Sequence, residues 1–203
     1  HTNTEGASTI DKDGKCTVCG TQFAAGIGET YYTDVPSALD AAADGQTVKL
    51  LNDTKENVTI SKMLTLDLNG HTLNGGQVKG TPALTVTARV TVKDSSDAQT
   101  GKIMREDTAE NSGVSSHYVI DIQGGWLTFE SGTVKNGSGA GGTKGASLVR
   151  VGDDSVAEYP GLNIKGGTFT QDNFIVIKVD RGDLFLNGGT LNSANSYAVE
   201  NWH

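Results

Sequence analysis

Residues 184–191 read Leu184-Phe185-Leu186-Asn187-Gly188-Gly189-Thr190-Leu191, and this pattern decides the fold. Two apolar residues one apart are typical of a short strand, a polar pair containing glycine turns the chain, and threonine with an apolar residue begins the next strand. The same pattern recurs at residues 66–73, 127–134 and 162–169. Because an internal repeat indicates one supersecondary unit stacked on copies of itself, the sequence predicts a solenoid.

The spacing of the repeat indicates which solenoid this is. We call the first apolar residue of each repeat its anchor. If Leu66, Val90, Leu127, Leu162 and Leu184 are equivalent anchors, the shortest separation between successive anchors is 22 residues. The longer separations then represent the same unit with inserted loops. A unit of this length is too short for a propeller blade and lacks a helical period. We expect an all-β, right-handed, single-stranded parallel β-helix with three sheets and about 22 residues per bare rung.

Residues 33–45 predict the one helix of the chain. Asp34 is a candidate N-cap, Pro36 falls in the first turn, and Gly45 marks the end. A solenoid needs a cap, since an uncovered first rung exposes apolar side chains and unpaired backbone. We therefore expect this helix to cover the first rung. Its apolar side consists of Val35, Ala38, Leu39 and Ala42.

The N-terminal segment differs in composition from the repeats, so we divide the chain into a linker or cysteine-knuckle module, 1–28, and a β-helix domain, 29–203, that continues past the last residue. Cys16 and Cys19 have the spacing of half a zinc site, and His1 with an acidic residue would complete four ligands. A local disulfide or two free thiols is the alternative interpretation.

Composition limits the partners. The chain has 203 residues, 27 glycines and a formal net charge of −8, which disfavours a nucleic-acid backbone as partner. No apolar run approaches the ~18 residues that a membrane span needs, and no sorting signal is visible. We expect a monomeric module that neither binds nucleic acid nor inserts directly into a membrane.

A resemblance to a known family rests on the strand at 47–51, on Asp67-Leu68-Asn69-Gly70-His71-Thr72-Leu73, and on the later Gly-Gly-Thr-Phe and Gly-Gly-Thr-Leu rungs. These segments resemble pectate-lyase-like β-helix domains of large Gram-positive surface proteins, which are often adhesins. The segment 16–20 resembles the cysteine knuckles between their modules. The resemblance covers residues 30–203 and implies an extracellular protein, secreted or attached to the cell wall. It transfers no catalytic residue, because the same fold carries lyases, hydrolases, phage tailspikes and adhesins.

Inserted loops indicate where a ligand would sit. Residues 105–117, 137–147 and 152–161 all fall at corners that flank the first sheet of each rung, whereas the corner after each anchor stays short. The first sheet is thus expected to be the floor of a trough with loops as walls. Recognition sites commonly lie on loops carried by a rigid scaffold.

Alternation of side chains predicts two outward columns on that floor. The charged column contains Thr87, Asp121, Arg150, Lys178 and Glu200. The apolar column contains Thr85, Val119, Leu148, Val176 and Ala198. We take the charged residues from 121 onward, with Val119, Leu148 and Val176, as candidate ligand contacts. The alternatives are an ordinary surface salt-bridge ladder, worth ~0–1 kcal/mol per pair, and loops that cover the apolar column.

The favoured function is binding without catalysis or cofactor. The partner would be a host or environmental glycan or glycoprotein, or a host protein such as an immunoglobulin or matrix component. A second hypothesis is a lyase or glycoside hydrolase for an acidic polysaccharide, in which Asp121, Arg150 and Lys178 act with a loop acid or bound calcium. A third is a structural spacer that binds nothing. Arg181-Gly182-Asp183 matches an integrin-binding tripeptide, but a tight turn favours glycine and aspartate anyway.

Overall fold

The computed structural model describes residues 10–11, 13–75, 80–105, 118–136, 147–172 and 174–202. Its strands form three sheets. The eight-stranded sheet contains β1 (Ala25–Ile27), β2 (Thr30–Tyr32), β3 (Thr47–Leu50), β5 (Leu64–Asp67), β8 (Arg89–Lys93), β11 (Trp126–Phe129), β14 (Gly161–Ile164) and β17 (Asp183–Leu186). The six-stranded sheet contains β4 (Val58–Ile60), β7 (Leu84–Val86), β10 (Ile120–Ile122), β13 (Val149–Val151), β16 (Ile177–Val179) and β19 (Val199–Asn201). The five-stranded sheet contains β6 (Thr72–Gly75), β9 (Lys102–Arg105), β12 (Thr133–Asn136), β15 (Thr168–Gln171) and β18 (Thr190–Ser193).

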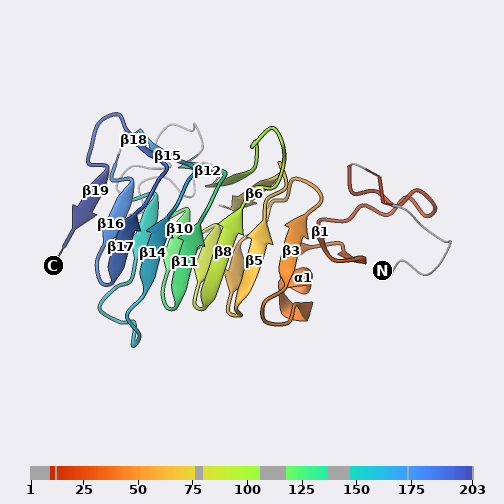
Figure 1. Cartoon of the computed structure of the whole chain (residues 1–203), viewed down its shortest axis with the longest axis horizontal. Helices are drawn as coiled ribbons and strands as arrows, with labels where there is room; N and C mark the ends of the chain where they lie inside the picture. Colours follow the sequence, from red (N-terminus) through yellow and green to blue (C-terminus); the bar gives the residue numbers. More distant parts are fainter. Residues whose placement is uncertain are drawn as a thin grey trace.

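From β4 onward the chain visits the six-, eight- and five-stranded sheets in turn, and each strand pairs in parallel with the strand one rung away. Leu127 pairs with Leu162, which pairs with Leu184, so these anchors are stacked as predicted. Figure 1 shows the rungs side by side along the long axis of the molecule. The prediction of a right-handed parallel β-helix with three sheets is confirmed.

The register of the first anchor differs from the prediction. Val90 pairs with Leu64 and not with Leu66. The repeat containing Leu66 matches its neighbours at its end, where Leu73 pairs with Ile103, but its turn is two residues longer than the later turns. A two-residue shift keeps the same side chains inward, so the fold tolerates it.

Side chains of alternate residues fill the interior of the coil. The residues predicted to point inward from the six-stranded sheet, namely Ile120, Ile122, Val149, Val151, Ile177 and Val179, are all buried. Phe129 and Phe169 meet inside the coil with ring centroids 4.8 Å apart. Burial of each such side chain contributes about 1.5–3 kcal/mol, so one continuous core stabilises the whole rod.

The helix α1 (Val35–Ala41) closes the N-terminal end of the core, as predicted. The carboxylate of Asp34 accepts a hydrogen bond from the Ser37 amide at 2.8 Å, and Val35, Ala38 and Leu39 are buried. The hairpin β1–β2 pairs antiparallel to β3, so the eight-stranded sheet already begins at Ala25, ahead of the boundary expected at residue 29. Among the helices that the structure describes, none is long and apolar enough to cross a membrane.

Candidate functional site

The six-stranded sheet is the first sheet of each rung and carries the predicted charged column. Each of its strands contributes one residue to the column. In register, the column reads Thr59, Thr85, Asp121, Arg150, Lys178 and Glu200. Thr85 therefore takes the place predicted for Thr87, which is exposed just after β7. The order Asp121, Arg150, Lys178 and Glu200 agrees with the prediction.

The apolar column predicted to face outward is wrong. Val119, Leu148 and Val176 are each 0% exposed and belong to the hydrophobic core. The chain bends at all three positions, immediately before β10, β13 and β16, and such a bend interrupts the alternation of strand side chains. Val119 therefore shares the core with its neighbour Ile120, and none of these three residues can contact a ligand.

Arg150 is held by the carboxylates on either side of it. Its Nε and Nη2 donate to the two oxygens of Asp121 at 2.8 and 2.7 Å, and its Nη1 lies 3.0 Å from Asp153. The ring of Tyr118 lies 4.7 Å from its Cζ. Gln123 donates a further hydrogen bond to Asp121, whose side chain is 3% exposed. Every nitrogen of the guanidinium thus has an anionic partner.

This arrangement argues against Arg150 as a proton acceptor. Burial alone would lower the pKa of Arg150, but the hydrogen bonds and charge of Asp121 outweigh it and raise the pKa above its ordinary value. A general base needs a pKa near the working pH and an atom that reaches the substrate. Arg150 has neither, and the side chain of Asp121 is buried against Arg150 and Gln123, so their geometry fits a pair that holds two rungs together.

Lys178 lies in an open groove, which we call the first-sheet groove. It is lined by Asp153, Asp154, Lys178, Asp180 and Trp202 and has a volume of about 440 Å³. The Nζ of Lys178 lies 2.8 Å from Asp180 and 4.9 Å from the centre of the Trp202 ring. Its ion pair is therefore with Asp180 and not with Glu200, its neighbour in register.

The loop 152–161 builds one wall of the groove. Asp153 accepts hydrogen bonds from the amide and hydroxyl of Ser155, which with the charge of Arg150 lower the pKa of Asp153. Arg181 donates to the Val156 carbonyl at 3.0 Å. Arg181 thus fastens the loop to the next rung and is not displayed as an integrin ligand would be. The other two predicted walls, 105–117 and 137–147, fall outside the described residues except at Arg105 and Ser147.

Three residues of this region escaped the sequence analysis: Tyr118, Asp180 and Trp202. Asp180 has a sequence signal, because it follows Lys178 by two residues at the end of a short strand. The other two have none, since their contacts with Arg150 and Lys178 cross between rungs. Pairs so distant in sequence become visible only when the coil is built.

The described part of the cysteine knuckle contains two of the predicted zinc ligands, Cys16 and Cys19. The Cys19 amide donates to the Cys16 sulfur at 3.4 Å; Cys16 is buried, Cys19 is exposed, and the two do not form a disulfide. His1, the third predicted ligand, lies outside the described residues. In the described part of the chain, no three His, Cys, Asp or Glu side chains are grouped to hold zinc or calcium.

A second hollow, of about 340 Å³, lies at the N-terminal end between residues 22–24 and 52–56. One of its titratable groups, Glu56, accepts a hydrogen bond from the Val35 amide at 3.1 Å, at the start of α1. Burial raises the pKa of Glu56. We assign this carboxylate to the attachment of the capping helix.

Comparison with protein-family models, with curated proteins and with solved structures finds no match to the chain. Function must therefore be argued from the side chains themselves. Along the six-stranded sheet, the groove at Lys178 brings the exposed Asp154 and Trp202 together with the half-buried Asp153, Lys178 and Asp180.

Proposed function

We propose that the chain is a binding module of a secreted or cell-surface protein, and that the first-sheet groove contacts a glycan or glycoprotein. The observation that carries the proposal is the exposed indole of Trp202 above Lys178, beside the carboxylates of Asp154 and Asp180. The family resemblance of residues 30–203 to pectate-lyase-like surface domains supports the same proposal.

The scaffold favours binding because the groove is preformed. Parallel pairing of β13, β16 and β19 positions the floor, and Arg181 fastens the wall. A ligand therefore orders little of the protein when it binds, which lowers the entropic cost. The volume of about 440 Å³ also lies within the ~300–1,000 Å³ typical of ligand pockets.

The charge balance of the groove selects the ligand class. Three carboxylates, of Asp153, Asp154 and Asp180, line it together with one ammonium group, and the whole chain carries a net charge of −8. A polyanionic chain would be repelled, whereas a neutral or amino sugar would not. We therefore favour neutral or amino-sugar glycans over the acidic polysaccharide of the second hypothesis.

Binding is tested with the full 203-residue chain on a glycan array and against serum and matrix proteins. Trp202→Ala should weaken binding to the best hit at least about tenfold, the expected effect of losing a cation–π partner and a stacking surface together. Tyr197→Ala is the matched control, because Tyr197 is 66% exposed, comparable to Trp202 at 63%, and does not line the groove.

Two results would contradict the proposal. Silence of the wild-type chain on every array and protein would leave the spacer hypothesis. Unsaturated products from polygalacturonate or alginate, abolished by Lys178→Ala, would instead identify a lyase.

A further inference from the structure

The outer face of the eight-stranded sheet carries a group of side chains that the first-sheet groove does not use. In β11, Leu127 and Phe129 are fully buried, so the alternate residues Trp126 and Thr128 face outward. Strand alternation therefore places two rows of residues on the outer face. The first row, in register, is Arg89, Trp126, Gly161 and Asp183. The second row is Thr91, Thr128, Asn163 and Phe185.

Two aromatic rings on this face form one continuous surface. A Cβ atom added to Gly161 would lie 2.4 Å from the Cε3 and Cζ3 atoms of Trp126, so the indole occupies the space directly above that glycine. The ring of Phe185 lies 5.7 Å from the Trp126 ring, tilted by 36°. Phe185 is 47% exposed although it sits in a strand. We call Trp126, Gly161 and Phe185 the aromatic platform.

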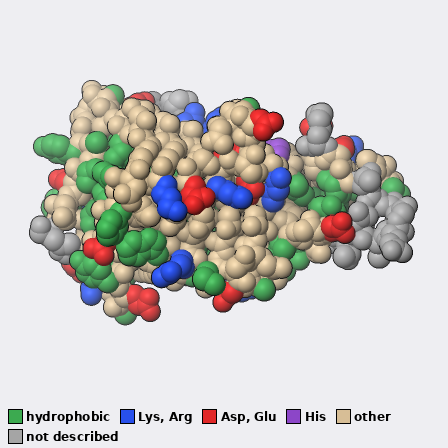
Figure 2. Space-filling view, viewed as in Figure 1, with side chains coloured by type: hydrophobic (Ala, Val, Ile, Leu, Met, Phe, Trp, Pro, Cys, Tyr) green, Lys and Arg blue, Asp and Glu red, His purple; other side chains and the backbone are tan. Residues whose placement is uncertain are grey.

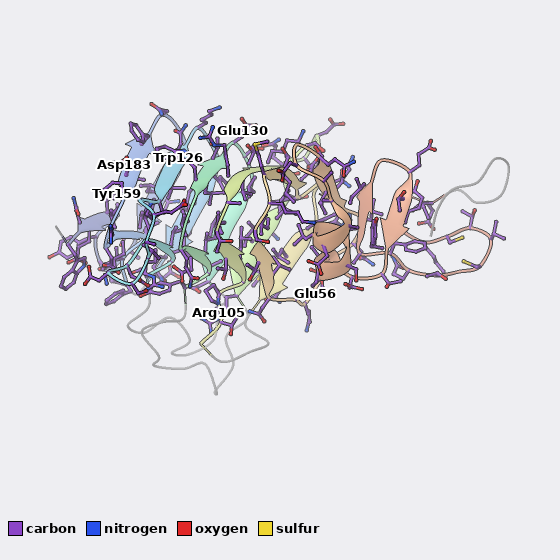
Figure 3. All side chains as sticks on the ribbon, turned by 90° about the horizontal axis from the view of Figure 1, so that it is seen from below. Glu56, Arg105, Trp126, Glu130, Tyr159 and Asp183 are labelled. Carbon is purple, nitrogen blue, oxygen red and sulfur yellow. The ribbon has the colours of Figure 1, made fainter. Side chains whose placement is uncertain are left out.

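Polar side chains border the platform. Arg89 and Asp183 stand at the two ends of the Trp126 row, and both are exposed. Asn163 lies beside Phe185 and accepts a hydrogen bond from Asn187 at 2.8 Å, which orients its carboxamide. In Figure 3, Asp183, Trp126 and Glu130 lie along one side of the molecule, and Tyr159 lies at the same end of the rod as Asp183. Arg105 lies on the opposite side.

Charges of both signs alternate on this face and nearly balance. Arg89 and Asp183 border the platform. Farther along the strands, Lys49, Asp67 and Lys93 follow one another in register, and Lys165 pairs with Glu130 at 3.3 Å. Figure 2 shows a row of alternating blue and red side chains on one face of the molecule, with a gathering of hydrophobic side chains beside it. An uncharged ligand therefore meets no net repulsion here, while a polyanion or polycation gains little from the field.

We propose that the aromatic platform binds an uncharged polysaccharide, by stacking sugar rings on Trp126 and Phe185. A pyranose has an apolar face of C–H groups. The hydrogens of these groups carry a small positive charge, which suits the negative face of an aromatic ring. Its hydroxyl rim needs donors and acceptors, which Arg89, Asn163 and Asp183 provide. A protein partner would need about 800 Å² of matching surface, and two rings among polar groups offer much less apolar area.

The site is separate from the first-sheet groove and does not depend on it. Trp126 and Trp202 are the two tryptophans of the chain, so Trp202→Phe leaves Trp126 as the sole tryptophan. In that variant, tryptophan fluorescence comes from Trp126 of the platform alone. The experiment titrates it with hexamers of β-glucan, xylan, mannan and chitin, and with oligogalacturonate as the charged probe.

One neutral hexamer should produce a saturable change in Trp126 fluorescence, and oligogalacturonate should not. Phe185→Ala should raise the dissociation constant at least tenfold, while Tyr197→Ala should leave it unchanged. Gly161→Ala should weaken binding too, because the added methyl group displaces the indole without removing it. Thermal melts of each variant confirm that the chain remains folded.

The proposal is overturned if no neutral hexamer changes the fluorescence, or if Phe185→Ala and Gly161→Ala both fold and bind like the parent. It is also overturned if binding of the wild-type chain is lost on Trp202→Phe, because the groove would then be the binding site. Loss of glycan binding in Trp202→Ala alone concerns the groove, so failure of either site can be told from failure of the other.

Discussion

At the scale of single residues, the carboxylate of Asp94 accepts four hydrogen bonds at one corner of the coil. Its Oδ1 accepts from the amides of Gly70 and Ser96 and from the Ser96 hydroxyl, and its Oδ2 accepts from the Gly101 amide at 2.6 Å. Its backbone amide also donates to the Ser131 hydroxyl of the next rung. Asp94 is 3% exposed, so these bonds join three successive rungs without competition from water.

Asp94→Asn should destabilise the protein by about 1–3 kcal/mol, because an amide nitrogen would face backbone N–H donors. In a chain of this size, that corresponds to a fall in Tm of roughly 2–4 °C per kcal/mol. Urea unfolding measures the effect, and Asp97→Asn, an exposed residue in the same corner, is the control. Equal stabilities of the two variants would contradict the role of Asp94.

The same carboxylate makes stability depend on pH. Burial alone would raise the pKa of Asp94, but the hydrogen bonds from Ser96, Gly101 and Gly70 outweigh it and lower the pKa below the ordinary 3.8. The folded state therefore binds this proton less readily than the unfolded state. The stabilisation is complete above the unfolded pKa and is lost as pH falls through the folded pKa. The difference in unfolding free energy between wild type and Asp94→Asn should therefore become smaller below about pH 4. A difference that stays constant with pH would contradict the lowered pKa of Asp94.

At the scale of strands, neighbouring rungs differ in how completely their inward-pointing side chains are buried in the core. Ile164 of β14 is 0% exposed, while its partner in register, Leu186 of β17, is 52% exposed because β17 is the last strand of its sheet. Ile164 and Leu186 both point inward, but only the strand of Ile164 has a neighbouring strand on both sides.

Ile164→Ala should therefore cost about 2–5 kcal/mol, as for a fully buried aliphatic side chain. Leu186→Ala should cost about 1 kcal/mol or less, since half of its surface is in water already. Chemical denaturation of both variants tests the difference. A loss at Leu186 as large as that at Ile164 would mean that Leu186 is covered in solution, for example by a second copy of the chain.

At the scale of the whole molecule, each rung of the coil contacts only its neighbours. Stability in such a rod is approximately a sum of rung terms and interface terms. Local opening should then be easiest at the last rung, whose strands β17, β18 and β19 each have a partner on one side only.

Amide hydrogen exchange should therefore be slowest in β8, β11 and β14 and fastest in β18 and β19. Exchange measured by mass spectrometry on the intact chain resolves these strands. Uniform exchange along the rod would show instead that it opens as one cooperative unit.

The fold was predictable because its signal is periodic. The glycine-containing turn after two alternating apolar residues identifies the repeat at 127–134, 162–169 and 184–191, and the signals at Asp34 and Pro36 identify the cap. The charged column from Asp121 to Glu200 followed from the same alternation. Local chemistry along the chain suffices for all of these, since each depends on residues close in sequence.

Only the tertiary structure decided which outward side chains meet water and which meet one another. Bends before the strands bury Val119 and its equivalents, and the stacking of rungs brings Trp126 over Gly161 and Trp202 near Lys178. These contacts depend on the register between rungs and on the geometry of each corner, which a one-dimensional pattern does not contain. The sequence by itself therefore determined a coil with a charged column, and the winding of that coil determined the groove and the platform.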